Sequence, residues 1–234
     1  SLPTPRPALR LVMTTGGETE MRFSKAPHDD VTQKMAAFTA DYLPKIGDLA
    51  GFIVCAKSPS CGMERVRVYD ENGNRGRKEG VGLFTAALLE TFPWLPVEED
   101  GRLHDPVLRE NFVERVFALH ELNVMRKNGL TRRALLDFHS RYKLQLLAHH
   151  QAGYREIGPF VASLHEWDDL DAFFVAYRDK LMTILKKPAS RKNHTNVLMH
   201  IQGYFRNQLN SRQRGELREV ILNYRAGLLP ILAP

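Results

Sequence analysis

The sequence predicts an α/β domain with a mostly parallel sheet, followed by an all-α helical bundle domain. Over the first half of the chain, strand-like and helix-like apolar patterns alternate. After Leu130 the apolar spacing is helical and no strand signal remains. Asn128-Gly129 ends the last helix of the first half, so we place the domain boundary there, between residues 1–128 and residues 129–234.

The N-terminal domain is expected to begin with two strands and a helix. Residues 8–13 alternate in the manner of a strand, a Gly-Gly turn follows, and residues 20–23 return as a short strand. The acidic segment 28–30 (His-Asp-Asp) supplies N-cap chemistry for a helix over 31–43.

The remaining elements of this domain follow in the same alternation. Residues 51–56 form a short, nearly continuous apolar run, which is typical of a strand buried on both faces. Residues 64–69 alternate and predict a half-exposed strand. A helix over 81–92 stops at a proline, and residues 95–97 are expected to form one more strand. The last helix covers 106–127, with proline at its first position.

Start and stop signals divide the C-terminal domain into helices. Thr131 and Ser211 are expected N-caps, an Asp pair begins the third helix, Pro188 follows its end, and Gly227 ends the fifth. The expected helices cover residues 131–151, 151–164, 168–186, 194–209 and 212–225.

Composition limits the classes of protein that this chain can represent. Of its 234 residues 43% are hydrophobic and 26% charged, which predicts a folded globular protein. No run of 18 apolar residues predicts a transmembrane helix. Two cysteines are too few for a disulfide framework, and residues 1–20 lack the plan of a secretory signal, so we expect a cytoplasmic protein. Because the chain begins at Ser1 rather than Met, we expect that upstream residues are missing.

The excess of positive over negative charge lies in the second half. Residues 1–127 carry 17 Lys and Arg against 18 Asp and Glu, a net charge of −1, whereas residues 128–234 carry 16 against 9, a net charge of +7. Two interpretations stay open, namely a well-solvated surface and a face that meets phosphates.

The segment Lys57-Ser58-Pro59-Ser60-Cys61-Gly62 is the first candidate site. It follows the expected buried strand, and ligands bind at the carboxyl ends of parallel strands. An exposed Cys61 beside Lys57 favours a thiolate, as nucleophile or metal ligand, and Ser58 and Ser60 add hydroxyls for a polar substrate. The alternative is a turn with an incidental cysteine. Cys55 lies within the apolar run and is expected to be buried and structural.

Three further segments are weaker candidates for a binding site. Residues 70–80 superficially resemble a calcium loop but lack its acidic spacing, so we expect a mobile loop. The amino end of the helix beginning at Val81 is a weak candidate for anion binding. Residues 98–100 (Glu-Glu-Asp) are expected to form a solvated acidic turn.

The nine histidines do not have zinc-site spacing. His139, His149 and His194 share the apolar faces of expected helices, which favours hydrogen-bonded core histidines. The alternative is a polar pocket between helices, lined by His139, Arg141, Lys143, His194 and His200.

Two parts of the chain resemble known families. The strings PRPALRLV (residues 5–12) and GFIVCAKSPSCG (51–62), with the segment GVGLFTAALLETFPWLPVEEDGRL, resemble the thiouracil desulfidase (TudS) family. Residues 131–230, which include NVLMHIQGYF, resemble the YbgA-type helical domain. The two domains occur fused in bacteria.

The resemblance implies a chemistry and its cofactor. TudS-like enzymes hold a 4Fe–4S cluster through three cysteines and convert thiouracil to uracil and sulfide without a redox change. Cys61 matches the third cluster cysteine, and Ser58 matches a serine implicated at the substrate. The first two cysteines and a glutamate of the family pattern lie upstream of the PRPALRLV strand and are absent from this sequence. We therefore expect no intact cluster in this chain, and desulfuration only in the complete protein.

A non-catalytic binding module is the second hypothesis. Its basic helical domain would contact RNA or a protein partner, although no named RNA-binding motif is present. The residues to test are Arg132, Arg133, Arg141, Lys143, Lys186, Lys187, Arg191 and Lys192. A third hypothesis makes residues 1–127 a docking domain that is no longer catalytic.

Overall fold

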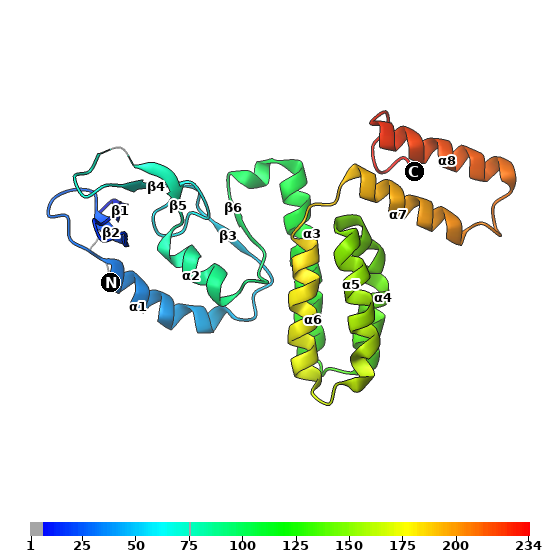
Figure 1. Ribbon diagram of the computed structural model, residues 1–234, viewed down its shortest axis with the longest axis horizontal. Helices are drawn as coiled ribbons and strands as arrows, with labels where there is room; N and C mark the ends of the chain where they lie inside the picture. The colour runs from blue at the N-terminus through cyan, green and yellow to red at the C-terminus, as the bar shows by residue number, and fades with distance from the viewer. Residues whose placement is uncertain (1–6, 75) are drawn as a thin grey trace. The chain divides into compact units, whose positions relative to one another are not determined.

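A computed structural model describes residues 7–74 and 76–234. The chain forms two compact units, Ser1–Asn123 and Val124–Pro234 (Figure 1). An α/β unit precedes an all-α unit, which confirms the predicted fold class. The domain boundary expected at residue 128 stays a prediction.

Among the described residues of the N-terminal unit, the strands form two small sheets. The first has the order β2-β1-β4-β5, in which β1 (Leu9–Met13) is antiparallel to β2 (Thr19–Phe23) and parallel to β4 (Val66–Tyr69). The edge strand β5 (Arg77–Gly80) is antiparallel to β4. The second sheet pairs β3 (Phe52–Val54) with β6 (Val97–Glu99) in parallel. The sheets are therefore mixed and not parallel throughout.

Three α-helices accompany these strands: α1 (Thr32–Tyr42), α2 (Leu83–Thr91) and α3 (Pro106–Lys127). Short 3-10 helices cover Leu43–Ile46 and Arg102–His104. The expected 106–127 helix is confirmed.

Two strand expectations were wrong in position. Residues 77–80, which were expected within a loop, form the strand β5. The first three residues of β5 are exposed, and an exposed edge strand needs no alternation of apolar residues. The sequence therefore has no strand pattern there. The strand expected at 95–97 lies at 97–99 instead. It includes two glutamates that a hydrophobic pattern does not select.

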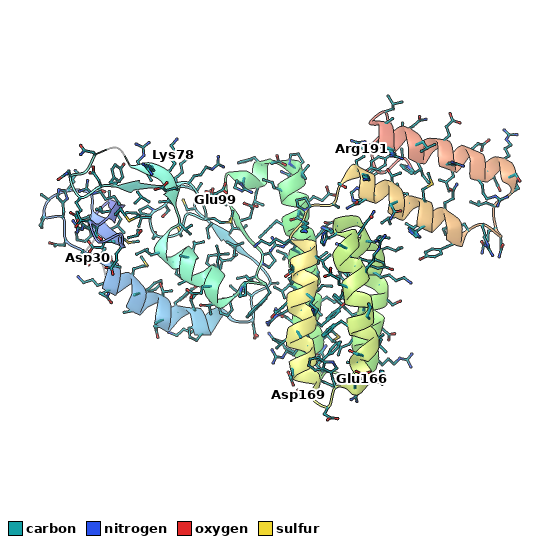
Figure 2. The ribbon with its side chains drawn as sticks, in the orientation of Figure 1. Asp30, Lys78, Glu99, Glu166, Asp169 and Arg191 are labelled. Carbon is teal, nitrogen blue, oxygen red and sulfur yellow. The ribbon has the colours of Figure 1, made fainter. Side chains whose placement is uncertain are left out.

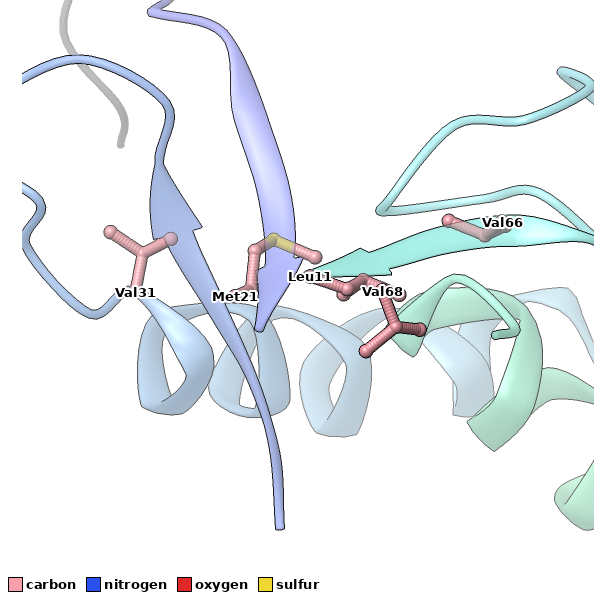
Figure 3. Packing of buried hydrophobic residues seen from close by; sticks show 5 residues of the cluster. All are labelled: Leu11, Met21, Val31, Val66 and Val68. Atoms are coloured by element: carbon pink, nitrogen blue, oxygen red, sulfur yellow. The ribbon is translucent and has the colours of Figure 1, made fainter. Parts of the chain in front are cut away.

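The core of the first sheet is a small apolar cluster. Leu11, Met21, Val31, Val66 and Val68 are all buried, and Figure 3 shows them in a row that crosses β2, β1 and β4. A separate aromatic group joins the helices to β3.

Phe84 of α2 is the centre of that aromatic group. Its ring centroid lies 6.2 Å from that of Phe38, 6.0 Å from that of Tyr42 and 5.8 Å from that of Phe52. The rings of Phe38 and Tyr42 stack with their centroids 5.4 Å apart. These two residues, four apart on α1, therefore pack on each other, although both remain partly exposed.

The C-terminal unit contains five α-helices, and each has a side-chain N-cap. The helices are α4 (Arg132–His149), α5 (Gln151–Ala162), α6 (Leu170–Leu185), α7 (Arg191–Tyr204) and α8 (Ser211–Ala226), with a 3-10 helix at Ser163–Glu166. The capping residues are Thr131, His150, Asp169, Ser190 and Asn210. Buried aromatic residues of α4 and α6 fill the core, among them Phe138, Phe173 and Tyr177.

Two helix starts differ from the prediction. Helix α7 begins at Arg191, three residues earlier than expected, because the Ser190 side chain accepts the backbone N–H of Asn193. Helix α8 is capped by Asn210 in a reciprocal capping box with Gln213, and not by Ser211. The predicted Gly227 terminus is confirmed, with φ of 88°. None of the described helices combines the length and apolar character needed to cross a membrane.

Candidate functional site

The segment that carries Cys61 follows the carboxyl end of β3. We call residues 58–62 the SPSCG loop. Its first turn is closed by its own serines: the Ser58 and Ser60 hydroxyl oxygens lie 3.0 Å apart, and Ser58 Oγ accepts the Cys61 N–H at 3.3 Å. The Gly62 N–H donates to the Ser58 carbonyl at 2.8 Å. Ser58, Ser60 and Cys61 are thus brought together in one hydrogen-bonded turn.

The SPSCG loop sits on the amino end of α2. The backbone N–H groups of Gly82, Leu83 and Phe84 donate to loop carbonyls at 2.8, 3.2 and 2.9 Å, and Thr85 Oγ1 donates to the Cys61 carbonyl at 2.8 Å. A Cβ on Gly82 would lie 2.5 Å from Cys61 N, so only glycine permits this approach. These helix N–H groups are occupied by the loop, which removes the basis for the anion site expected there.

Two carboxylates at the carboxyl end of β6, that of its last residue Glu99 and that of the next residue Asp100, hold the ends of the loop segment. Glu99 Oε1 accepts the N–H groups of Met63 and Glu64 at 2.9 and 3.3 Å, and Asp100 Oδ1 accepts the N–H of Ala56 at 3.0 Å. Glu99 is 5% exposed and Glu98 8%, so the expectation of a solvated acidic turn was wrong. Figure 2 marks Glu99 within the N-terminal unit.

The physical reason for that error is the parallel pairing of β3 with β6. Carboxyl ends of parallel strands meet at one edge, so residues after β6 lie beside residues after β3. Sequence reasoning used this rule for Cys61 but did not apply it to Glu99. The sequence did contain this information, because residues 57–62 and residues 98–100 were both expected to follow strands.

Charged residues surround this contact. Arg102 bonds Glu98 through Nε at 2.6 Å and Glu64 through Nη1 at 2.7 Å. Burial alone would raise the pKa of Glu64, but the hydrogen bonds and charges of Arg65 and Arg102 outweigh it and lower that pKa. Hydrogen bonds from Ala56 and Gly101 lower the pKa of Asp100, so its carboxylate is ionised at neutral pH.

The segment between these anchors has strained ends. Lys57 has φ of 61° and Arg65 has φ of 53°, and side chains rarely adopt this left-handed region. The hydrogen bonds to Asp100 and Glu99 fall directly beside these two residues. Strain that is held by surrounding structure is typical of ligand sites.

The two cysteines have different surroundings. Cys55 is exposed, so the expectation of a buried structural cysteine was wrong. The strand β3 ends at Val54, and in a two-stranded sheet even Ile53 is 55% exposed. Cys61 is half-buried rather than exposed, because its backbone is fixed between α2 and the Ser58 hydroxyl.

The residues present do not fit a complete iron–sulfur cluster. A cubane cluster needs several thiolate ligands, and the chain has two cysteines. Within residues 7–74 and 76–234, no group of three or more His, Cys, Asp or Glu side chains is arranged to hold a metal ion. Of the two cysteines, only Cys61 lies on the SPSCG loop.

A basic hollow of about 230 Å³ adjoins the loop segment. Lys57 and Pro59 line it, together with Arg10, Arg67 and Tyr69, whereas Ser58, Ser60 and Cys61 do not. The Arg10 guanidinium lies 5.8 Å from the Tyr69 ring centroid, and its buried Nε has no hydrogen-bond partner among the described residues. Sequence reasoning did not select Arg10, because a single arginine in a strand carries no pattern.

The candidate residues of the C-terminal unit do not form one pocket. Nδ1 of His139 lies 3.1 Å from the Tyr177 hydroxyl oxygen, and Nδ1 of His194 lies 2.8 Å from that of Tyr224. His200 is exposed on α7 and lines a different hollow. The remaining members of this set are spread over the unit: Arg141 and Lys143 on α4, and Arg191 and Lys192 at the start of α7.

Arg191, marked in Figure 2, has a structural role. Its Nη1 donates to the Tyr224 carbonyl at 2.7 Å, and its guanidinium lies 4.9 Å from the Tyr224 ring centroid.

Burial, with the charge of Lys143, lowers the pKa of His139, so this imidazole is neutral at pH 7.

Comparison with known proteins agrees with this division of the chain. Residues 1–100 match the family model "2-thiouracil desulfurase", and residues 143–234 match "Protein of unknown function (DUF1722)". "Uncharacterized protein YbgA" of Escherichia coli (strain K12) is 53% identical over 120 residues, which cover 51% of this chain and 71% of that protein. No solved structure matches significantly.

Proposed function

Since this chain belongs to the family of YbgA from Escherichia coli and its first 100 residues match the 2-thiouracil desulfurase model, we propose that it serves the removal of sulfur from thiolated uracil. Water replaces sulfur at the ring carbon: a C=S bond is lost, a C=O bond forms, and hydrogen sulfide leaves. No electron is gained or lost, so no external oxidant or reductant is needed.

One observation supports this proposal above the others. The SPSCG loop, which holds a half-buried thiol and two hydroxyls 3.0 Å apart, is fixed on both sides by α2 and by Glu99. Fixed polar groups at the carboxyl ends of parallel strands are suited to orienting a small substrate. In this proposal Ser58 and Ser60 bind the ring edge, and Lys57 faces the basic hollow beside them.

The role of Cys61 in this proposal is that of a thiolate ligand in the complete protein. The 234 residues do not by themselves supply the ligand set of a 4Fe–4S cluster. The proposal places the complete enzyme in the reducing cytoplasm, where free thiolates persist.

The test compares this chain with the complete gene product, whose length is fixed by intact mass. After anaerobic reconstitution, iron is measured beside sulfide release from 2-thiouracil. We expect about four irons per chain and sulfide release from the complete product, and neither from the 234-residue chain.

Cys61→Ser in the complete product is expected to abolish iron binding and sulfide release, and Ser58→Ala to reduce sulfide release while iron is retained. Cys55→Ser is the matched control and is expected to change neither. Normal iron content in Cys61→Ser would overturn the ligand role. A cluster-loaded product that releases no sulfide from any thiolated uracil would overturn the desulfuration.

RNA binding by the C-terminal unit is a second candidate, which one observation favours. Lys186, Lys187, Arg191 and Lys192 are all exposed around the turn between α6 and α7. Arg132 and Arg133 do not extend this group, because they lie at the start of α4. Lys187 lies near the other end of that helix, where its Nζ is 2.8 Å from Nε2 of His150. An 18-residue helix is about 27 Å long.

The test of RNA binding uses Lys186→Glu with Lys192→Glu, since Arg191 is fixed to Tyr224. If the group contacts phosphates, affinity for single-stranded RNA falls with salt, and the double reversal reduces that salt dependence by about 1.4 in slope, at roughly 0.7 for each contact. Lys25→Glu with Lys34→Glu, both exposed in the N-terminal unit, changes net charge equally and is expected to have no such effect. Binding that is independent of salt would overturn this candidate.

A further inference from the structure

A second hollow, of about 270 Å³, lies in the C-terminal unit among α4, α5 and α7. We call it the α4–α5–α7 hollow. The apolar part of its lining is formed by Leu144 and Leu147 of α4, and Leu147 is 7% exposed. Leu147 belongs to a buried cluster with Ala148 and Val197, so this wall is part of the folded core and not a loose surface.

The polar part of the lining comes from two helices in regular rows. On α7, Asn196, His200 and Tyr204 follow one another at intervals of four residues and therefore share a face. On α5, Gln151 and Arg155 have the same spacing, with Tyr154 beside them. Two phenol rings, an imidazole, two carboxamides and a guanidinium thus converge on one apolar wall.

Three of these side chains differ from the histidines of the unit that have protein partners. His139 meets the Tyr177 hydroxyl, His149 Nδ1 lies 2.6 Å from the Lys187 carbonyl oxygen, and His194 meets the Tyr224 hydroxyl. By contrast, in the described part of the chain the side chains of Asn196, His200 and Tyr204 have no hydrogen-bond or ion-pair partner. Asn196 is half-buried and His200 and Tyr204 are exposed, so their donors and acceptors are available to a ligand in this hollow.

The chemistry of the lining selects a class of ligand. Aromatic rings favour a flat partner with a π face, and carboxamides pair with a ring that presents both C=O and N–H groups. Arg155 supplies a positive charge and no carboxylate lines the hollow, which disfavours an amine or other cation. Drug-sized ligands occupy about 300–1,000 Å³, so a hollow of this size suits a single small ring system.

We propose that the α4–α5–α7 hollow is a binding site for a pyrimidine-type base, held by ring contacts with Tyr154 and Tyr204 and by hydrogen bonds with Asn196 and His200. This site is formed by residues of the C-terminal unit alone and shares none with the SPSCG loop. It does not require the desulfuration proposed above, and its test does not measure turnover.

Uracil is the probe, and its binding to the whole chain is followed by saturation-transfer NMR and titration calorimetry. We expect binding of uracil and none of benzamidine, which is flat but cationic. Asn196→Ala and Tyr204→Ala are each expected to weaken uracil binding by about tenfold, since loss of one stacking or hydrogen-bonding partner corresponds to roughly 1.4 kcal/mol. Tyr204 is 58% exposed, so its replacement leaves the core intact, which circular dichroism verifies.

Two controls keep the result specific to this hollow. Asn207→Ala, exposed just beyond α7 and outside the lining, is expected to bind uracil as the parent does. Lys57→Ala removes a residue of the other hollow and is also expected to leave this binding unchanged. Absence of uracil binding would overturn the proposal, and so would binding that survives Asn196→Ala and Tyr204→Ala but is lost with Lys57→Ala. Equal binding of benzamidine would overturn the assigned chemistry.

Discussion

Glu99 shows how one side chain determines the position of another far away in sequence. Its buried carboxylate accepts the N–H groups of Met63 and Glu64, directly after the SPSCG loop. Removing it leaves two half-buried donors without this partner, and an unsatisfied group costs at most about 1–3 kcal/mol. The Cys61 thiol is therefore held by a residue that takes no part in its chemistry.

The first prediction concerns Glu99→Ala. We expect the free energy of unfolding to fall by about 1–3 kcal/mol and Cys61 to react several-fold faster with a thiol reagent, because the loop loses an anchor. Cys55, which is exposed in the parent, is expected to react at an unchanged rate and serves as the internal reference. Glu90→Ala on the exposed side of α2 is the control. An unchanged Cys61 rate would contradict the anchoring role.

The second prediction concerns Gly82→Ala. The added methyl group would approach Cys61 N to 2.5 Å, and backbone atoms cannot rotate away as a side chain can. We expect the SPSCG loop to be displaced, with a stability loss of about 1–3 kcal/mol and faster labelling of Cys61. Gly101→Ala, where a Cβ meets nothing within 4 Å, is the matched control. Equal behaviour of the two variants would refute the close packing of loop and helix.

At the scale of elements, helices were more predictable than strands. The helix 106–127 and the caps at Thr131 and Asp169 follow from local signals, because a helix start depends on a few adjacent residues. The strand β5 and the exposed position of Cys55 depend on which neighbours pair, which local patterns do not specify.

The same distinction applies to the candidate site. The sequence indicated the SPSCG loop because two serines and a cysteine follow an apolar run. Glu99 and Arg10 were missed, since their roles arise only when β6 lies beside β3 and β1 beside β4. Contacts between segments distant in sequence carry this information.

The contact between α4 and α6 gives a third prediction. Burial, with the Lys143 charge, lowers the pKa of His139, so the folded unit disfavours its protonated form. Unfolded histidine takes up a proton near pH 6.5. Stability is therefore fully present above that pH and declines as pH falls through the lower pKa of the folded state.

Thermal unfolding measured between pH 7.5 and 5.0 checks this effect. His139→Gln, which retains a hydrogen-bonding group near Tyr177, is expected to show a weaker dependence on pH than the parent. His165→Gln, exposed at the end of the 3-10 helix, is expected to retain the dependence of the parent. A stability that does not change over this range would contradict the prediction.

On the scale of the whole molecule, each unit has buried apolar residues of its own. Leu11 and Met21 belong to one cluster, whereas Leu181 is fully buried in the C-terminal unit. Leu181→Ala is expected to destabilise the C-terminal unit by about 2–5 kcal/mol, through lost burial and a cavity. Hydrogen exchange should therefore accelerate in residues 124–234.

The peptides that cover β1 and β4 are the reference for this fourth prediction. Their exchange is expected to remain at the parent rate, because their cluster contains no residue of the C-terminal unit. A uniform acceleration over both units would show that the molecule unfolds as one cooperative body. Leu232→Ala, 94% exposed, provides a substitution of the same type without a buried partner.

The side-chain caps of helices α4 to α8 also affect how fast the chain folds. Each cap is decided within a few residues, and α4 contacts α5, α5 contacts α6 and α7 contacts α8. Contacts between such near neighbours in sequence are typical of fast-folding domains. In the N-terminal unit, β1 must find β4, and β3 must find β6, across long intervening segments. Closing such loops is slower. During synthesis, the half that leaves the ribosome last is therefore expected to complete its structure in less time than the half that leaves first.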